Sequence, residues 1–297
     1  MPDDGHNDPV GTGPAMADGA RTVTRQLPVM PGVSPFAASG PGHRTLMAML
    51  AFISLVLVAS LLLGQAAIAI YVLGFWHYYL YGLAYRYGKV PLALFKRDAV
   101  LMKSVALAAL GVAYFSCPPD WLSLAVMAAG FGLNALAARV LGVDRTYYGH
   151  EVAGLPHRRI SAFPYSQVGH PMLVGNMVAY AGTMINDSFR EQWWLLASMH
   201  VAFNLALLAM EMRVKPLHGA GAAPASATGT PAALAGLGAA GAMAGAAVAF
   251  VYLGDDRRAL AGALLGAGIV IFARVIYGFY SGAVPGTGGR LQGREAQ

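Results

Sequence analysis

Cysteine and charged residues are scarce in this sequence of 297 residues. The single cysteine, Cys117, excludes a disulfide framework and any zinc cluster built on several cysteine thiolates. Only 11% of the residues are charged, whereas 57% are hydrophobic and the mean hydropathy is +0.53. An ordinary soluble domain carries about 25% charged residues. The composition therefore argues against a soluble globular domain and predicts a membrane protein.

Several uncharged runs approach the roughly 20 residues that a helix needs to cross about 30 Å of hydrocarbon. We therefore predict an all-α fold, a polytopic transmembrane helical bundle with about eight crossings; six or seven crossings are the alternatives. The predicted crossings are two helices within 45–85, then 99–115, 121–142, 171–185, 193–212, 232–253 and 259–279. The segment 171–185 is short for a full crossing, as a tilted or partly re-entrant helix would be. One long helix followed by an interfacial segment is the alternative for 45–85, since the aromatic run 75–79 is typical of a headgroup belt; basic residues on both flanks favour the two-helix hairpin.

Composition also predicts how the chain is divided. Residues 1–44 are rich in Gly, Pro, Ala and Asp, cannot bury a core, and are predicted to form a disordered tail without a signal-peptide pattern. The remaining predicted units are a membrane core over 45–218, a Gly/Ala/Pro/Ser linker over 219–231, an appended transmembrane hairpin over 232–280 and a C-terminal tail over 281–297.

Lysine and arginine gather in the segments 86–103, 139–159 and 213–215, whereas the turn around Cys117 has none. Because cytoplasmic loops are enriched in these residues, we expect the three segments to face the cytoplasm and Cys117 the opposite side. The predicted location is a bacterial inner membrane or the endoplasmic reticulum, with several crossings. The net charge of +6 then reflects topology and contact with anionic lipids, not a nucleic-acid partner.

One polar stretch, 145–176, stands out in this apolar chain. Its ionisable side chains include those of His150, Glu151, His157, Arg158, Arg159 and His170. Such a cluster is where polar chemistry can take place, and a solvated cytoplasmic loop is the alternative. No metal site is predicted.

The helix predicted over 193–212 carries His200, Asn204 and Glu211. At about 100° per residue these three side chains fall within roughly 40° of one another. Polar groups inside membrane helices are costly and normally face a cavity or the bundle interior. The stripe therefore indicates a functional surface, with hydrogen bonding between helices as the alternative.

Gly130 and Gly132 flank Phe131 in the helix before the polar stretch. Glycines allow a ligand to approach the backbone closely, but they also serve helix packing in membranes. Neither their spacing nor their context is that of a dinucleotide-binding fingerprint or a P-loop.

The stretch 162–182, whose core reads FPYSQVGHPMLVGNMVAYAG, resembles the corresponding segment of the phosphatidylethanolamine N-methyltransferases. More widely, 128–216 is similar to the integral-membrane methyltransferases that include isoprenylcysteine carboxyl methyltransferase. The chain departs from the family pattern at Leu173, where an aromatic residue is frequent, and at Gly169, where some members have Arg. It also has Met210 before Glu211, where the phospholipid enzymes have two acidic residues.

The resemblance implies S-adenosyl-L-methionine as the cofactor. Its site would be formed by an HPxYxG-like element, an upstream GxG element and a glutamate at the end of the next helix. These elements correspond to His170, Pro171 and Gly175, to Gly130 and Gly132, and to Glu211.

The resemblance also implies methyl transfer to a membrane lipid amine at the cytoplasmic interface, with phosphatidylethanolamine or a partly methylated derivative as the acceptor. An amine with a pKa near 10.4 is mostly protonated at neutral pH and needs a base, for which His150 and Glu151 are the candidates. The candidate substrate-binding residues are Arg158 and Arg159, which could pair with a lipid phosphate, and His200 and Asn204.

Other functions fit the same sequence. The acceptor could instead be an isoprenylcysteine carboxylate, which needs no deprotonation at neutral pH, or a small thiol. A second class is a membrane protein that binds lipid or cofactor without turnover, and a transporter is the least favoured because no inverted repeat is evident. The sequence leaves the oligomeric state open.

Overall fold

The computed structural model describes residues 39–87, 90–149, 155, 160–213 and 256–282. Within these ranges the chain forms eight helices and no strand, which confirms the predicted all-α class. The helices are α1 (Pro41–Leu62), α2 (Ala66–Tyr87), α3 (Leu92–Phe115), α4 (Trp121–Leu141), α5 (Val143–Thr146), α7 (Pro171–Thr183), α8 (Asp187–Arg213) and α10 (Asp256–Gly282).

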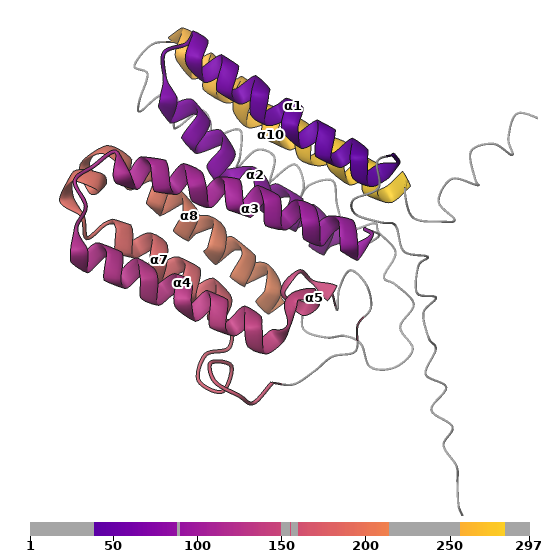
Figure 1. Ribbon diagram of the computed structural model, residues 1–297, viewed down its shortest axis with the longest axis vertical. Coiled ribbons are helices and arrows are strands. Elements are labelled where there is room, and N and C mark those ends of the chain that lie inside the picture. Colours follow the sequence, from indigo (N-terminus) through magenta and orange to yellow (C-terminus); the bar gives the residue numbers. More distant parts are fainter. Residues whose placement is uncertain (1–38, 88–89, 150–154, 156–159, 214–255, 283–297) are drawn as a thin grey trace, which may run out of the picture.

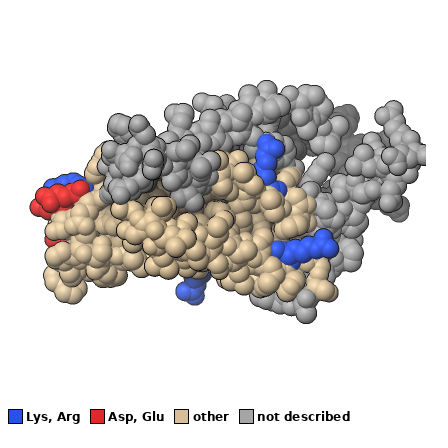
Figure 2. Space-filling view, turned by 90° about the horizontal axis from the view of Figure 1, so that it is seen from above, with Lys and Arg blue, Asp and Glu red and all other residues tan. Residues whose placement is uncertain are grey.

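Five of these helices, α1, α2, α3, α4 and α8, are long and apolar enough to cross a membrane, by length and composition. The outer face of α1 is apolar, and Leu61 and Leu62 are about 80% exposed. Figure 2 shows a described surface that is mostly uncharged on the visible face, with the acidic side chains in view gathered at one end. These features confirm a polytopic membrane bundle.

A sharp turn separates α1 from α2, as predicted for residues 45–85. Gly64 has φ of +62°, a left-handed conformation that residues with a Cβ adopt at a cost. The Gln65 amide donates to the Ser60 carbonyl (2.9 Å), and the Ser60 hydroxyl donates to the Gln65 carbonyl (2.6 Å). These bonds satisfy backbone groups that the helix ends leave without partners.

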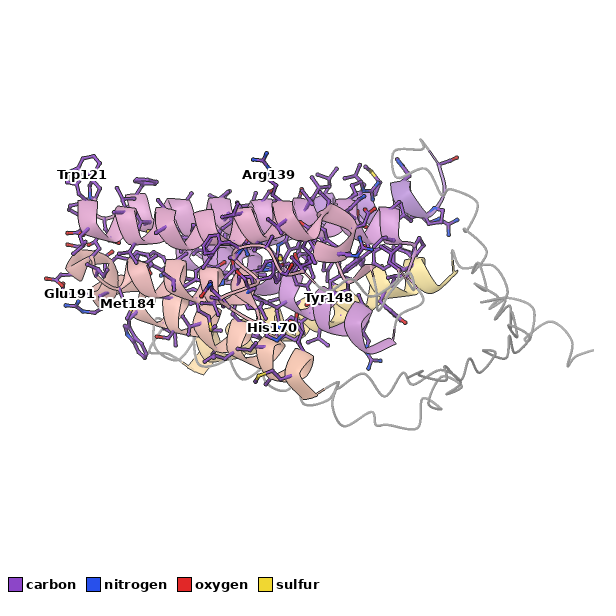
Figure 3. All side chains as sticks on the ribbon, turned by 90° about the horizontal axis from the view of Figure 1, so that it is seen from below. Trp121, Arg139, Tyr148, His170, Met184 and Glu191 are labelled. Atoms are coloured by element: carbon purple, nitrogen blue, oxygen red, sulfur yellow. The ribbon has the colours of Figure 1, made fainter. Side chains whose placement is uncertain are left out.

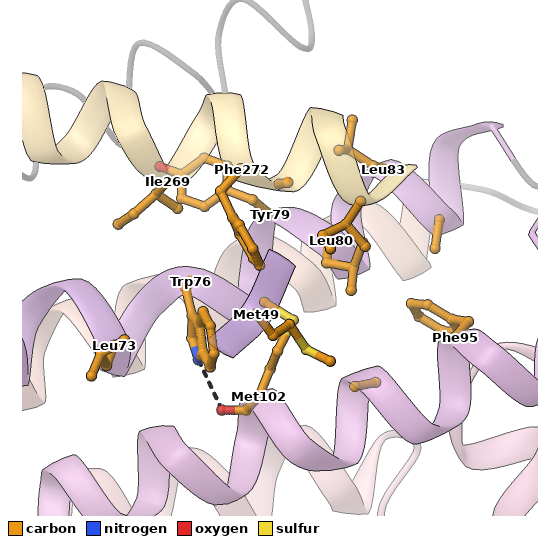
Figure 4. Close-up of a cluster of buried hydrophobic side chains, with 14 of the residues drawn as sticks. Met49, Leu73, Trp76, Tyr79, Leu80, Leu83, Phe95, Met102, Ile269 and Phe272 are labelled. Carbon is orange, nitrogen blue, oxygen red and sulfur yellow. Dashed lines mark hydrogen bonds between the residues drawn. The ribbon is translucent and has the colours of Figure 1, made fainter. Parts of the chain in front are cut away.

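The helices form two groups (Figure 1). In the first, α2 packs against α1, α3 and α10, and in the second, α7 lies between α4 and α8. The core of the first group is shown in Figure 4, where Trp76 stacks on Phe272 (5.5 Å between ring centroids) and its indole N–H donates to the Met102 carbonyl (2.9 Å). Helix α8 contacts both α2 and α3, and so joins the two groups.

The aromatic run 75–79 lies in this interior, so the predicted headgroup belt is wrong. Its five side chains are between 1% and 6% exposed. Helix α2 is enclosed by α1, α3, α8 and α10, so that most of its surface is buried and aromatic residues serve as core residues there.

Helix α3 begins at Leu92, earlier than the predicted segment 99–115, because its charged residues have partners inside the protein. The Arg97 guanidinium donates to Asp98 (2.7 Å) and to the Thr45 hydroxyl of α1 (2.6 Å). Asp98 also accepts from the hydroxyl of Tyr280 on α10 (2.7 Å). The basic residue that predicted a cytoplasmic loop is thus part of a buried network linking three helices.

Helix α8 also begins earlier than predicted, at Asp187 and not at 193. The side chain of Asn186 caps it by accepting from the Phe189 amide (3.1 Å), and it donates to the Pro118 carbonyl (2.9 Å) in the turn between α3 and α4. Helix α10 belongs to the predicted appended hairpin and packs on α1 and α2. The other predicted helix, 232–253, the linker 219–231 and the two predicted tails fall largely or wholly outside the described residues, so the division into units stays a prediction.

Candidate active site

The two ends of the second helix group differ in chemistry (Figure 3). Trp121, Met184 and Glu191 lie at one end, and His170 and Tyr148 lie toward the other. The latter, which we call the His170 end, is where α4 ends, α7 begins and α8 ends.

An imidazole and a carboxylate meet at the His170 end. His170 precedes the first turn of α7, and Glu211 lies in the last turn of α8, 41 residues later. His170 Nδ1 is 2.9 Å from Glu211 Oε2, a distance at which the ring N–H donates to the carboxylate. The side chains are 37% and 24% exposed, so a ligand can reach both. Two residues that the sequence predicts for one cofactor site are thus in contact.

Tyr165 is a third polar group near this pair, and the sequence-based prediction did not include it. Burial, and to a lesser extent the negative charge of Glu211, raise the pKa of Tyr165 to about 12. Its phenol therefore stays protonated at neutral pH and can donate a hydrogen bond. The available signal was a hydroxyl-bearing aromatic five residues before His170, within the stretch that carries the resemblance.

The beginning of α7 is held in place by two features of its sequence. Pro171 is buried at the first helical position, where a proline loses no hydrogen bond. On α4, the Asn134 side chain donates to the Met172 carbonyl (2.9 Å) in the first turn of α7. These contacts determine where His170 projects.

Gly130 and Gly175 lie where the backbones of α4 and α7 approach each other closely. A Cβ added at Gly130 would lie 2.5 Å from the Ala179 nitrogen and 2.6 Å from the Gly175 oxygen. A Cβ added at Gly175 would lie 2.6 Å from the Gly130 oxygen. Close packing of two helices explains both glycines. Their role in cofactor binding stays a prediction.

Gly132 is turned away from this contact, by about 200° around the helix from Gly130. A Cβ added there would meet nothing within 4 Å. The structure therefore places the two glycines of the GxG element on different faces of α4. The predicted role of Gly132 is likewise untested.

His200 and Asn204 are 1% exposed and lie in the bundle interior. The Asn204 amide donates to the Tyr78 hydroxyl of α2 (2.9 Å), and that hydroxyl lies 3.1 Å from His200 Nδ1. The Asn176 amide of α7 donates to Asn204 Oδ1 (3.2 Å). The His200 ring also stacks on Tyr180 (4.1 Å, interplanar angle 6°). These contacts tie α2, α7 and α8 together, and substrate binding by the two residues stays a prediction.

The other predicted site residues, His150, Glu151, Arg158 and Arg159, lie outside the described residues. Among the side chains that the structure describes, no three of His, Cys, Asp or Glu come together as metal ligands would.

The fold and the site together define a membrane-embedded helical protein with a partly exposed imidazole–carboxylate pair at one end of the bundle. The comparison with protein families identifies the class more closely: residues 120–214 match the family model described as phospholipid methyltransferase. The match covers about a third of the chain and includes the whole of α4, α5, α7 and α8, with both His170 and Glu211. It confirms the resemblance predicted over 128–216 and indicates a methyltransferase. Neither the comparison with curated proteins nor that with solved structures found a match.

Proposed function

We propose that the protein transfers methyl groups from S-adenosyl-L-methionine to the amine of a membrane phospholipid, at the His170 end of the bundle. The observation that carries this proposal is the 2.9 Å contact between His170 and Glu211 inside the segment that matches the phospholipid methyltransferases. The acceptor would be phosphatidylethanolamine or a partly methylated derivative, and the His170 end would face the cytoplasm.

The residues at this end suit the cofactor chemically. A carboxylate accepts hydrogen bonds from amino and ribose hydroxyl groups, and it offsets positive charge nearby. In our proposal Glu211 takes this role, and His170 holds the carboxylate in a fixed orientation by donating from Nδ1. When bound, the cofactor supplies a methyl group on a positively charged sulfur.

The position of the pair suits a lipid acceptor. A phospholipid headgroup lies at the membrane interface and the cofactor comes from water, so the site must be open to both. The pair is partly exposed at the end of the helices, and much of α4 beside it is exposed. The protein would contribute mainly by orienting the two reactants, which can account for much of the rate of such a transfer.

Other predicted residues complete the proposal. A protonated amine must lose its proton before it attacks, and His150 or Glu151 would accept it. Arg158 and Arg159 would pair with the lipid phosphate. His200 and Asn204 remain candidates for contacts with the substrate deeper in the bundle.

The cofactor site is tested by comparing two carboxylates of the same helix. Glu211→Gln should weaken S-adenosyl-L-methionine binding by roughly ten- to a hundredfold, the usual effect of losing a hydrogen bond to a charged group. Glu191→Gln, at the opposite end of α8, should leave the affinity unchanged. Equal affinities of wild type and Glu211→Gln, measured by calorimetry in detergent, would remove Glu211 from the site.

The acceptor is tested by incubating membranes that contain the protein with cofactor labelled on the methyl group. We expect label in aminolipids. Label in base-labile methyl esters would indicate a carboxylate acceptor, and volatile label a thiol. Cofactor binding without transfer to any of these would indicate a protein that binds and does not catalyse.

A further inference from the structure

Two asparagines join the helices that carry His170 and Glu211. The Asn176 amide of α7 donates to Asn204 Oδ1 of α8 at 3.2 Å. The amide nitrogen of Asn204 donates to the Tyr78 hydroxyl of α2 (2.9 Å), so the carboxamide is held from both sides. At 1% exposure, Asn204 has little opportunity to exchange these partners for water.

The spacing along the two helices relates this bond to the site. Asn176 follows His170 by six residues, and Asn204 precedes Glu211 by seven. At 1.5 Å per residue these intervals correspond to about 9 Å and about 10.5 Å along the helix axes. Because α7 and α8 run in opposite directions, both intervals lead from the asparagine pair to the His170 end.

We propose that Asn176 and Asn204 are positioning residues that set the register between α7 and α8, and thereby bring His170 and Glu211 together. This inference rests on the proposed function in one respect, namely that the His170–Glu211 pair binds the cofactor. Apolar helix surfaces offer little resistance to sliding in a membrane, since lipid tails are as apolar as the side chains. A buried polar pair resists it, as single asparagines do in coiled coils.

The site is sensitive to a small slip. Sliding one helix by a single residue moves its side chains by about 1.5 Å along the axis. The 2.9 Å distance between His170 Nδ1 and Glu211 Oε2 would then exceed the roughly 3.2 Å limit of a good hydrogen bond unless both side chains rearranged.

The first measurement is structural and needs no cofactor. In protein labelled with ¹⁵N-histidine and ¹³C-glutamate and placed in lipid bilayers, solid-state NMR reports the distance from His170 Nδ1 to the Glu211 carboxyl carbon. We expect a short distance in the wild type and a longer one in Asn204→Ala. If Asn204→Ala fails to fold, Asn176→Ala removes the same bond from its less buried side and should lengthen the distance likewise.

Ser123→Ala is the matched control. The Ser123 hydroxyl donates to the Gly182 carbonyl (2.8 Å), and this bond joins α4 to α7 near the end of α7 away from His170. Losing it should lower the melting temperature but leave the His170–Glu211 distance as in the wild type.

The second measurement is cofactor affinity in a double-mutant cycle. If Asn204 acts through Glu211, Asn204→Ala should weaken binding about tenfold in the wild-type background and have no further effect in Glu211→Gln. An unchanged NMR distance in both asparagine variants, or equal losses in both backgrounds, would overturn the proposal. If the distance lengthens in the asparagine variants but the wild-type protein binds no cofactor, the proposed register is supported and the proposed function is contradicted.

Discussion

Gly130→Ala should destabilise the protein because α4 and α7 have no room for a methyl group between them. The added Cβ would lie 2.5 Å from the Ala179 nitrogen and 2.6 Å from the Gly175 oxygen, whereas unstrained contacts are about 3.5–4.0 Å. The helices must therefore separate by about 1 Å. Overpacking of this kind costs about 1–3 kcal/mol, and the better helix propensity of Ala returns up to about 1 kcal/mol. We expect a net loss of about 1–2 kcal/mol.

Gly132→Ala provides the comparison, since it makes the same substitution on the same helix where nothing lies within 4 Å of the added atom. Its stability should be unchanged or slightly raised. Reversible unfolding of both variants in mixed micelles with increasing dodecyl sulfate measures the difference. Equal stabilities would refute the packing argument. A stable Gly130→Ala protein that has lost cofactor affinity would instead support the ligand-binding role that the resemblance implies.

Three further outcomes are expected. The topology is tested with Pro119→Cys in a Cys117→Ser background, because Pro119 is exposed whereas Cys117 is only 4% exposed. The new thiol should react with an impermeant maleimide in intact cells. Reaction only after permeabilisation would reverse the predicted orientation. Tyr280→Phe should lower the free energy of unfolding by about 1.5–3 kcal/mol because it removes a hydrogen bond to the buried carboxylate of Asp98. Tyr79→Phe should lower it less, because the Tyr79 hydroxyl has no hydrogen-bond partner among the described residues. Similar unfolding midpoints for the two variants would contradict this. If His150 is the base, the rate of methyl transfer should rise with pH as the amine deprotonates. His150→Ala should slow the transfer by about 10²–10⁴-fold at neutral pH and by less at high pH. Superimposable pH profiles of the two proteins would exclude His150 as the base.

The membrane class could be predicted from the sequence, and so could two residues that the structure brings together at the candidate site. Uncharged runs indicated the helices, and the hairpin turn at Gly64 lies near the middle of the uncharged run 45–85. The resemblance selected His170 and Glu211, which the structure brings into contact. Tyr165 was missed because a single tyrosine in a loop carries no periodic signal.

Errors in the prediction arose where charge or aromatic content was interpreted without knowledge of neighbours. The predicted helix 99–115 left out Arg97, yet α3 begins at Leu92 and Arg97 is buried in the protein, where Thr45 and Asp98 accept from its guanidinium. The aromatic run 75–79 predicted an interfacial belt, yet it lies inside because four helices surround α2. Thr45 and the four helices around α2 come from distant parts of the chain, so a local sequence pattern does not reveal them.

The sequence by itself determined that this chain enters a membrane, because transfer of a segment into hydrocarbon depends mainly on that segment's own composition. It also determined the likeness of 120–214 to phospholipid methyltransferases. Only the tertiary structure decided which helices are neighbours, that Gly130 packs against α7, and that Asn176 meets Asn204. Such choices depend on shape and hydrogen bonds between residues far apart in sequence, since apolar helix faces are nearly equivalent in a lipid solvent.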